Sequence, residues 1–434
     1  MKLFLVPLCI MLLVSALLAQ EKPHAFRGAK IFPIASAPIE NGVLIVQNGV
    51  IKAVGDATKV SIPSNAVIHD VTGRQIMPGL VDTHSHIGEV SGGDRSATLH
   101  PDVRVLDGIN IFNDSFMKAR AGGVTTANIM AGSGYLMSGQ TLYVKLRKGR
   151  KIEDLMFCED PLNGVCGGMK MANGTNSIRA NAPFSGTRAK SAALVRELFI
   201  KAQEYREKQN KAKKDKKKDA PKRDLRMEGL LEVLDGKRIV HHHTHRHDDI
   251  LTVLRLSKEF GFRVVLHHVS EAWMVADEIA AAGVPCSIIA IDSPGGKLEA
   301  INLLNINGKA LEDVGVDVAY HTDDSITDSR LFLRSAAFGV KHGMSRAKAL
   351  ESVTLAGARM LDLQDRLGSL EKGKDADFII LSGDPLSVYT KIEQTWVEGD
   401  LMYDRSNPEQ RPYSTGGYEV FRGEFHAHDH GGAH

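Results

Sequence analysis

The sequence predicts an α/β protein whose central strands form a parallel sheet flanked by helices. Three observations lead to this class. Between residues 77 and 367, short apolar strands alternate with amphipathic helical segments, which is the pattern of successive βαβ units. Several of these strands run directly into histidine. Hairpin patterns lie outside this central region, at both ends of the chain.

The composition is that of a globular protein with enough apolar material for a core. Of the 434 residues, 43% are hydrophobic and 24% are charged. The net charge of +2 indicates neither a nucleic-acid nor a membrane partner. Most of the positive charge is local, because residues 201–226 carry twelve Lys or Arg and five Asp or Glu. We expect this Lys-rich segment to be a disordered or frayed helical insertion; a docking site for an acidic surface is the alternative.

The first 19 residues have the pattern of a secretory signal peptide. Lys2 supplies a positive charge, residues 3–18 are apolar, and Ala19 is a small residue suited to cleavage. A transmembrane anchor is the alternative, but the apolar run is short for one. We therefore expect a periplasmic or secreted protein with no stable membrane insertion after the signal is removed.

Three cysteines lie beyond the predicted signal peptide. In an exported protein Cys158 and Cys166 could form a disulfide, with Cys286 free and buried. Three unpaired core thiols are the alternative.

Both ends of the predicted mature chain have β patterns. In the first segment, apolar runs at residues 43–46 and 50–55 flank Asn48-Gly49, a hairpin turn signal. The second contains a turn and a buried strand within residues 367–381, followed by a hairpin at 394–403. We expect residues 20–76 and 368–410 to form one small β-sandwich beside the α/β region at 77–367.

The central region contains eight predicted strands. They lie at residues 80–81, 124–127, 141–146, 168–172, 238–243, 263–268, 285–291 and 317–323. Helical periodicity is clearest at residues 191–205, 248–260 and 345–361.

Histidines mark the ends of these strands. His84 and His86 follow the first strand, and residues two apart on an extended backbone point to the same face. Two neutral imidazoles so placed suit a first-row metal ion, with Zn²⁺ preferred. The fifth strand ends in a longer run of histidines. Alternation along the strand lets three of them share a face, and it does not show which of these is the ligand: His241, His243 and His245.

Two motifs resemble those of a known family. Residues 78–86, P-G-L-V-D-T-H-S-H, resemble the metal-binding signature of the amidohydrolase superfamily. Residues 368–377, G-S-L-E-K-G-K-D-A-D, are similar to a segment of that family's accessory β-domain. The resemblance covers residues 30–403. It implies a (β/α)8 TIM barrel with metal ligands at the carboxyl ends of its strands.

The resemblance also implies roles for single residues. The segment that begins at His243, H-T-H-R-H-D-D-I, resembles one in imidazolonepropionase-like and prolidase-like members, which makes His243 the metal ligand of strand five and places His245 near the substrate. His268 would bind a second metal ion or hold the substrate carbonyl. Asp323 would contact the metal and act as the general base. Asp324 is its nearest competitor.

The fourth strand departs from the family pattern. Its segment G-M-K-M-A-N-G-T-N resembles K-M-A-x-G-E-N, which implies that Lys170 is a carboxylated lysine bridging two metal ions. A salt-bridged or backbone-bonded lysine is the alternative. Thr175 stands where the family has glutamate, so the role of that carboxylate is either missing or supplied elsewhere.

Together the resemblances imply an exported amidohydrolase with one or two divalent metal ions. It would cleave a C–N bond of a small amide, peptide or cyclic amide with metal-activated hydroxide. Deamination is less favoured, because Thr244-His245-Arg246 follows His243 in place of the deaminase pattern. A deaminase or lactonase, and a non-catalytic metal-binding protein that uses the His-rich tail at 411–434, are the alternatives. Oligomeric state is open, with a homo-oligomer included.

Overall fold

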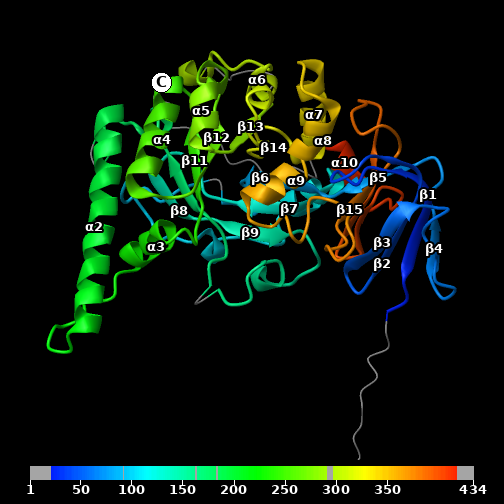
Figure 1. Cartoon of the computed structure of the whole chain (residues 1–434), viewed down its shortest axis with the longest axis horizontal. Helices are drawn as coiled ribbons and strands as arrows, with labels where there is room; N and C mark the ends of the chain where they lie inside the picture. Colours follow the sequence, from blue (N-terminus) through cyan, green and yellow to red (C-terminus); the bar gives the residue numbers. More distant parts are fainter. Residues whose placement is uncertain (1–20, 91, 162–163, 182–183, 291–296, 418–434) are drawn as a thin grey trace, which may run out of the picture.

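The computed structural model of the chain describes residues 21–90, 92–161, 164–181, 184–290 and 297–417 (Figure 1). The predicted signal peptide and the His-rich part of the tail lie outside the described residues, as does residue 291 at the end of the predicted seventh strand. In the part of the chain that is described, no helix is long and apolar enough to cross a membrane.

Strands from both ends of the chain form one eight-stranded sheet (Figure 1). Its order is β17-β16-β15-β5-β1-β2-β3, with β4 beside β1. The strands are β1 (His24–Ile31), β2 (Ile39–Gln47), β3 (Val50–Asp56), β4 (Val67–Asp70), β5 (Gln75–Pro78), β15 (Phe378–Leu381), β16 (Ile392–Val397) and β17 (Asp400–Asp404). The two ends meet where β5 pairs antiparallel with β15. A buried cluster on this sheet includes Phe26, Phe378 and Trp396. The two predicted end segments therefore share one sheet, while the sandwich stays a prediction.

The central strands form two sheets that carry the candidate site. One has the order β14-β13-β12-β11-β10-β8 and the other β6-β7-β9. Their bounds are β6 (Leu80–Ser85), β7 (Val124–Ile129), β8 (Met137–Gln140), β9 (Leu142–Lys145), β10 (Met169–Ala172), β11 (Val240–Thr244), β12 (Val264–His268), β13 (Cys286–Ile289) and β14 (Val318–His321). The sheets adjoin along β6 and β14, where the Asp323 N–H donates to the His84 carbonyl at 2.9 Å.

The segment predicted to form the third strand has a different structure. Residues 141–146 do not form one parallel strand; β8 and β9 lie on either side of Thr141 and run antiparallel to β10 and β7. The reason is the short connection after β7. Residues 130–136 are fewer than the roughly dozen residues that a parallel crossover needs, so the chain turns back at once.

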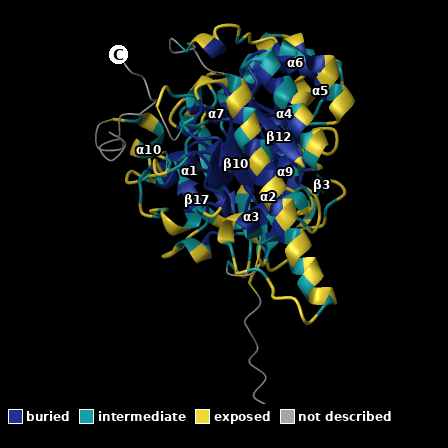
Figure 2. Ribbon diagram, turned by 90° about the vertical axis from the view of Figure 1, so that its left-hand side faces the viewer, coloured by how far each residue is buried: buried dark blue, intermediate teal, exposed yellow. Residues whose placement is uncertain are grey.

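Helices cover the outside of the central strands, and in Figure 2 the strands are buried while the helices alternate buried and exposed residues. The helices are α1 (Ser115–Ala121), α2 (Arg188–Lys214), α3 (Leu225–Leu234), α4 (His247–Phe260), α5 (Ala276–Ala282), α6 (Asn307–Asp313), α7 (Phe332–Lys341), α8 (Arg346–Ser352), α9 (Leu355–Met360) and α10 (Pro412–Thr415). The helix predicted at 345–361 is two helices. It breaks because the Val353 carbonyl accepts from the Val81 N–H at 3.0 Å instead of continuing the helix.

The Lys-rich segment is more ordered than expected. Helix α2 continues through residue 214, so the first half of 201–226 is helical and α3 begins within its last residues. Ala202 and Tyr205 are buried in the main core. They extend the buried stripe of Leu198 at helical spacing. The high lysine content concealed this periodicity, because most of the other residues of the segment are exposed (Figure 2).

Cys158 and Cys166 form a disulfide, which decides between the two alternatives left by the sequence. Cys286 is a buried free thiol.

Candidate metal centre

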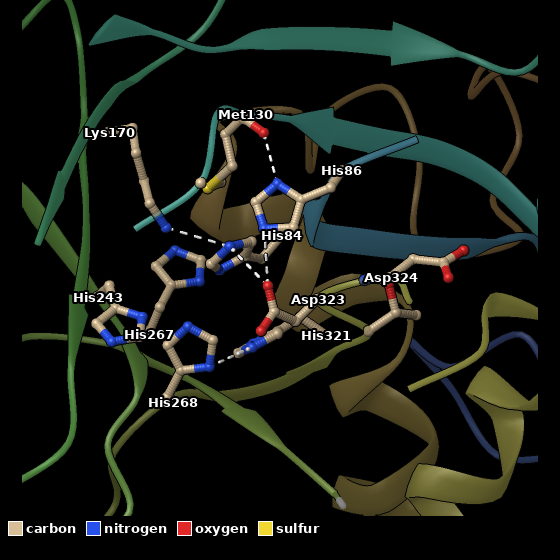
Figure 3. Close-up of polar contacts among 12 residues, drawn as sticks. His84, His86, Met130, Lys170, His243, His267, His268, His321, Asp323 and Asp324 are labelled. Atoms are coloured by element: carbon tan, nitrogen blue, oxygen red, sulfur yellow. Dashed lines mark hydrogen bonds and ion pairs between the residues drawn. The ribbon is translucent and has the colours of Figure 1, made fainter. Parts of the chain in front are cut away.

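Strand β6 delivers His84 and His86 to the carboxyl end of the central sheets (Figure 3). Nδ1 of His86 lies 2.7 Å from the Met130 carbonyl, which can only accept a hydrogen bond, so this nitrogen carries the proton. In the neutral ring, Nε2 is then an acceptor. It faces another acceptor, Asp323 Oδ1, at 2.8 Å. His84 Nε2 lies 3.3 Å from the same oxygen. Two acceptors at this distance repel each other unless an additional proton or a metal ion lies between them.

The structure separates the two neighbouring aspartates after β14. Asp323 faces the histidines, whereas Asp324 is directed away from them (Figure 3). Asp324 accepts a hydrogen bond from the buried Lys118 of α1 at 3.1 Å. Asp323 has a φ of 51°, and this left-handed residue turns the chain so that the two side chains diverge. The expected preference for Asp323 thus agrees with its position, and Asp324 has a structural partner.

Asp323 is ionised in this environment. Burial alone would raise the pKa of its carboxyl group, but the hydrogen bond and charge of His86, together with His321 and Lys170, hold that pKa below its usual value. A carboxylate that stays ionised can ligate a cation or accept a proton.

Lys170 of β10 is fully buried, with Nζ 3.1 Å from His84 Nε2. Burial lowers the pKa of its amine to about 7, although Asp323 opposes this shift and Lys297 adds to it. Among the described residues, Lys170 makes no ion pair, so the salt-bridge alternative has no partner there. A neutral amine is the form that reacts with CO₂, which suits the expected carboxylation.

His243 of β11 and His268 of β12 face the same region, with ring centroids 4.3 Å apart. Nδ1 of His243 and Nε2 of His268 are buried and have no hydrogen-bond partner in the described part of the chain. Burial, followed by nearby charges, holds the pKa of both rings well below the usual value, so both are neutral. Bare nitrogens of neutral imidazoles are the donors that a first-row metal ion takes.

A deeper layer of histidines was not singled out as part of the site. His267 and His321 form a second possible ligand group with His84, whose nitrogens lie within 4.8 Å of one another. His241 lies behind them and connects His267 at 2.9 Å to the Tyr143 hydroxyl at 2.8 Å. Alternation had already placed His241 on one face with His243, and the same period of two could have found His321, because it precedes Asp323 by two residues.

Beside the centre, the structure adds Lys297 and Glu299, which no sequence motif indicated. Nζ of Lys297 lies 3.0 Å from His245 Nε2, so His245 is placed near the centre as expected. Glu299 accepts from the Thr175 N–H at 2.7 Å, next to the position where the strand-four motif lacks its glutamate.

The residues present fit one or two divalent metal ions. His84, His268 and Asp323 offer atoms within 4.8 Å of one another, while His86 and His243 border this group. Imidazole with carboxylate suits Zn²⁺ and its first-row neighbours without selecting one of them.

Fold and site define an α/β protein with a histidine-rich centre at the carboxyl ends of its parallel strands. Residues 226–402 match the Amidohydrolase family. The crystal structure of an amidohydrolase from Thermotoga maritima MSB8 is 32% identical with a TM-score of 0.81, over 88% of this chain and 100% of that one. The chain belongs to the amidohydrolase family, which confirms the resemblance found in the motifs.

Two curated relatives show how far the similarity extends. An imidazolonepropionase from Deinococcus radiodurans is 26% identical over 413 residues, which are 84% of this chain and 91% of that protein. Amidohydrolase tasK from Hapsidospora irregularis is 28% identical over 392 residues, but the match spans 84% of this chain and only 40% of that relative.

Proposed function

We propose that this protein is an exported, metal-dependent amidohydrolase that cleaves a C–N bond in a small amide, peptide or cyclic amide. The observation that carries the proposal is the meeting of His86 Nε2 and Asp323 Oδ1 at 2.8 Å, two acceptors that a cation would reconcile. Family membership supports hydrolysis, and the bare nitrogens of His243 and His268 support a metal centre.

The proposal includes a closed (β/α)8 barrel within residues 77–367 and an accessory β-sandwich formed by 20–76 and 368–410. Supporting the barrel, Ser85 pairs in parallel with Asp324 where the two central sheets adjoin. Supporting the accessory unit, β5 and β15 join the two chain ends.

His84, His86 and Asp323 would hold one divalent ion, such as Zn²⁺, and His243 with His268 a second. Lys170, carboxylated by CO₂, would bridge them. This role is supported by the burial of its amine, which lowers the pKa to about 7. A bound ion would polarise the substrate carbonyl and lower the pKa of a water molecule.

Asp323 would move the proton. Its Oδ1 lies beside His84 and His86, so it borders the place where a water would be activated. The carboxylate would take the proton from that water and deliver it to the leaving nitrogen. His268 lies across the cluster from β6, where it could also orient the carbonyl oxygen.

Export is supported by two features. Residues 1–19 have the signal-peptide pattern, and the Cys158–Cys166 disulfide suits an oxidising compartment. A periplasmic or secreted location follows. Fractionation of cells with and without residues 2–19 tests it, because the full chain should leave the cytoplasm and the shortened chain should not.

The deciding experiment for function combines metal analysis with a substrate panel. Purified protein should contain at least one divalent ion per chain and should hydrolyse members of a panel of dipeptides, N-acyl amino acids and cyclic amides. A chelator should remove activity, and the ion should restore it. Metal-free, fully active protein would refute metal dependence; activity confined to lactones or to amino-substituted heterocycles would favour a lactonase or a deaminase.

A further inference from the structure

Lys297 is held in a defined position at the edge of the candidate metal centre. Its Nζ lies 3.0 Å from His245 Nε2 and 3.3 Å from Glu299 Oε1. On the other side of the His245 ring, Nδ1 lies 2.7 Å from the Ser270 hydroxyl. If Nδ1 carries the proton and donates to Ser270, Nε2 is free to accept from Lys297. His245 and Glu299 are thus the two nearest partners of the ammonium group.

Glu299 connects Lys297 to the backbone of the loop after β10. Its side chain is 2% exposed, yet its Oε2 accepts from the Thr175 N–H at 2.7 Å and lies 3.6 Å from Arg188. The carboxylate sits against Gly174, where an added Cβ would lie 2.5 Å from Oε2. Gly174 also has a φ of 77°, so this backbone passes close to Glu299 only because it lacks a side chain. Glu299 thus ties Lys297 to the loop after β10.

The ammonium group is close to the candidate reaction centre. The ring of His245 stacks on that of His268, with centroids 5.2 Å apart. Nζ of Lys297 lies 3.5 Å from His243 Nε2, and its charge interacts with Asp323. One imidazole ring therefore separates the cation from the cluster of His84, His268 and Asp323.

The side chain of Lys297 is not sealed off, because 28% of it is exposed. The third contact of Nζ, to His243 Nε2, is long at 3.5 Å and therefore weak. An anion that enters the site could take its place. In an N-acyl amino acid the carboxylate carbon lies two bonds from the amide nitrogen, so a substrate whose amide is at the centre places its carboxylate close to the centre as well.

We propose that Lys297 binds a free carboxylate of the substrate, with His245 and Glu299 as positioning residues. The substrate class is then an amide or peptide that bears a carboxylate next to its scissile nitrogen. This inference rests on the proposed amidohydrolase function. In this arrangement Glu299 is the carboxylate supplied from elsewhere to the loop in which Thr175 replaces glutamate.

The test compares N-acetyl amino acids that the wild type cleaves with their C-terminal carboxamides. For Lys297→Met, KM for the acids should rise about 10- to 100-fold, the value of a lost hydrogen bond to a charged group. Its kcat should stay within about threefold, and the carboxamides should be unaffected. Lys297→Arg should restore most of the binding. Lys309→Met, on the exposed side of α6, is the matched control and should behave as wild type.

Glu299→Gln tests the positioning role. The amide can still accept from the Thr175 N–H but no longer balances the charge of Lys297, so KM for the acids should rise by less than in Lys297→Met. Thermal unfolding of each variant shows whether folding is preserved. Calorimetric binding of N-acetyl amino acids provides a readout without turnover, and Lys297→Met should weaken it by the same factor as KM.

The outcomes separate this inference from the proposed function. If the wild type hydrolyses no amide in the presence of metal, the proposed function fails, while calorimetry still shows whether Lys297 binds the carboxylate. If acids and carboxamides are cleaved and bound equally well, or if Lys297→Met affects both alike, Lys297 does not recognise a carboxylate and the inference is overturned.

Discussion

Asp323 and His86 are 237 positions apart in the sequence, and their side chains meet at 2.8 Å between Oδ1 and Nε2. The contact joins the two central sheets at the point where β6 and β14 adjoin. The next residue, Asp324, turns to Lys118 instead. This divergence assigns different roles to two adjacent aspartates, and those roles can be measured separately.

We expect Asp323→Asn to affect chemistry more than folding. Asparagine keeps the shape and can still contact a metal ion, but it cannot take a proton. Bound metal and melting temperature should be largely retained, while kcat falls by about two orders of magnitude or more. Metal analysis, calorimetry and steady-state kinetics check these outcomes.

Asp324→Asn is the matched control for Asp323→Asn. It replaces the carboxylate that accepts from Lys118 by a neutral amide, while the charge of Lys118 still acts on Asp328, so the free energy of unfolding should drop by about 1 to 2 kcal/mol. The folded fraction should retain turnover. If Asp324→Asn is the inactive variant and Asp323→Asn is active, the general base has been assigned to the wrong aspartate.

His84→Ala should abolish both bound metal and activity. His84 is fully buried at the centre of the cluster, and its Nε2 faces both Lys170 and Asp323. His84 belongs to two of the possible ligand groups, so its removal takes one ligand from each. A fully metallated and active His84→Ala protein would contradict the ligand assignment.

The buried amine of Lys170 predicts a pH-dependent stability in the metal-free protein. Its pKa is about 7 in the folded state against 10.5 for the free side chain, so between these values the unfolded chain binds more protons. The free energy of unfolding should therefore rise as pH increases from about 7 to 10. Asp82, whose pKa burial raises to about 7, opposes this rise only near pH 7, since well above that value it is ionised in both states.

Urea unfolding of wild type and Lys170→Met in CO₂-depleted buffer measures the effect. The variant should lack the part of the slope that Lys170 contributes. Equal slopes in the two proteins would show that Lys170 stays charged in the folded state throughout the range from pH 7 to 10. Such a result would also weaken the case for its carboxylation.

The Lys-rich segment should not be dispensable as a whole. Tyr205→Ala should lower the free energy of unfolding by roughly 3 kcal/mol, because it removes a buried aromatic side chain from α2. Lys213→Ala and Lys214→Ala, at the exposed end of the same helix, should change stability and turnover very little. Deleting 201–226 should therefore destabilise the protein. An unchanged melting temperature after that deletion would restore the view of the segment as a surface insertion.

Much of the fold could be predicted because its signals are local. An apolar run followed by histidine marks the end of β6, β11 and β12 wherever these strands lie in space. The two departures from the predicted elements had different causes. The third strand reversed direction because its preceding connection is short, and α2 extended because Tyr205 finds the core.

The sequence by itself determined the family, the strands that carry the site and most of the side chains that reach it, because alternation along a strand and motif identity depend on near neighbours. Only the tertiary structure decided which acceptors face one another. The left-handed backbone at Asp323 separates it from Asp324, and the layer of His267 and His321 lies beneath the centre. Glu299 reaches Thr175 across 124 positions, through a contact that exists only once β10 and β13 lie in one sheet. Such contacts depend on how whole helices and strands pack, and the pattern of neighbouring residues in the sequence does not predict that packing.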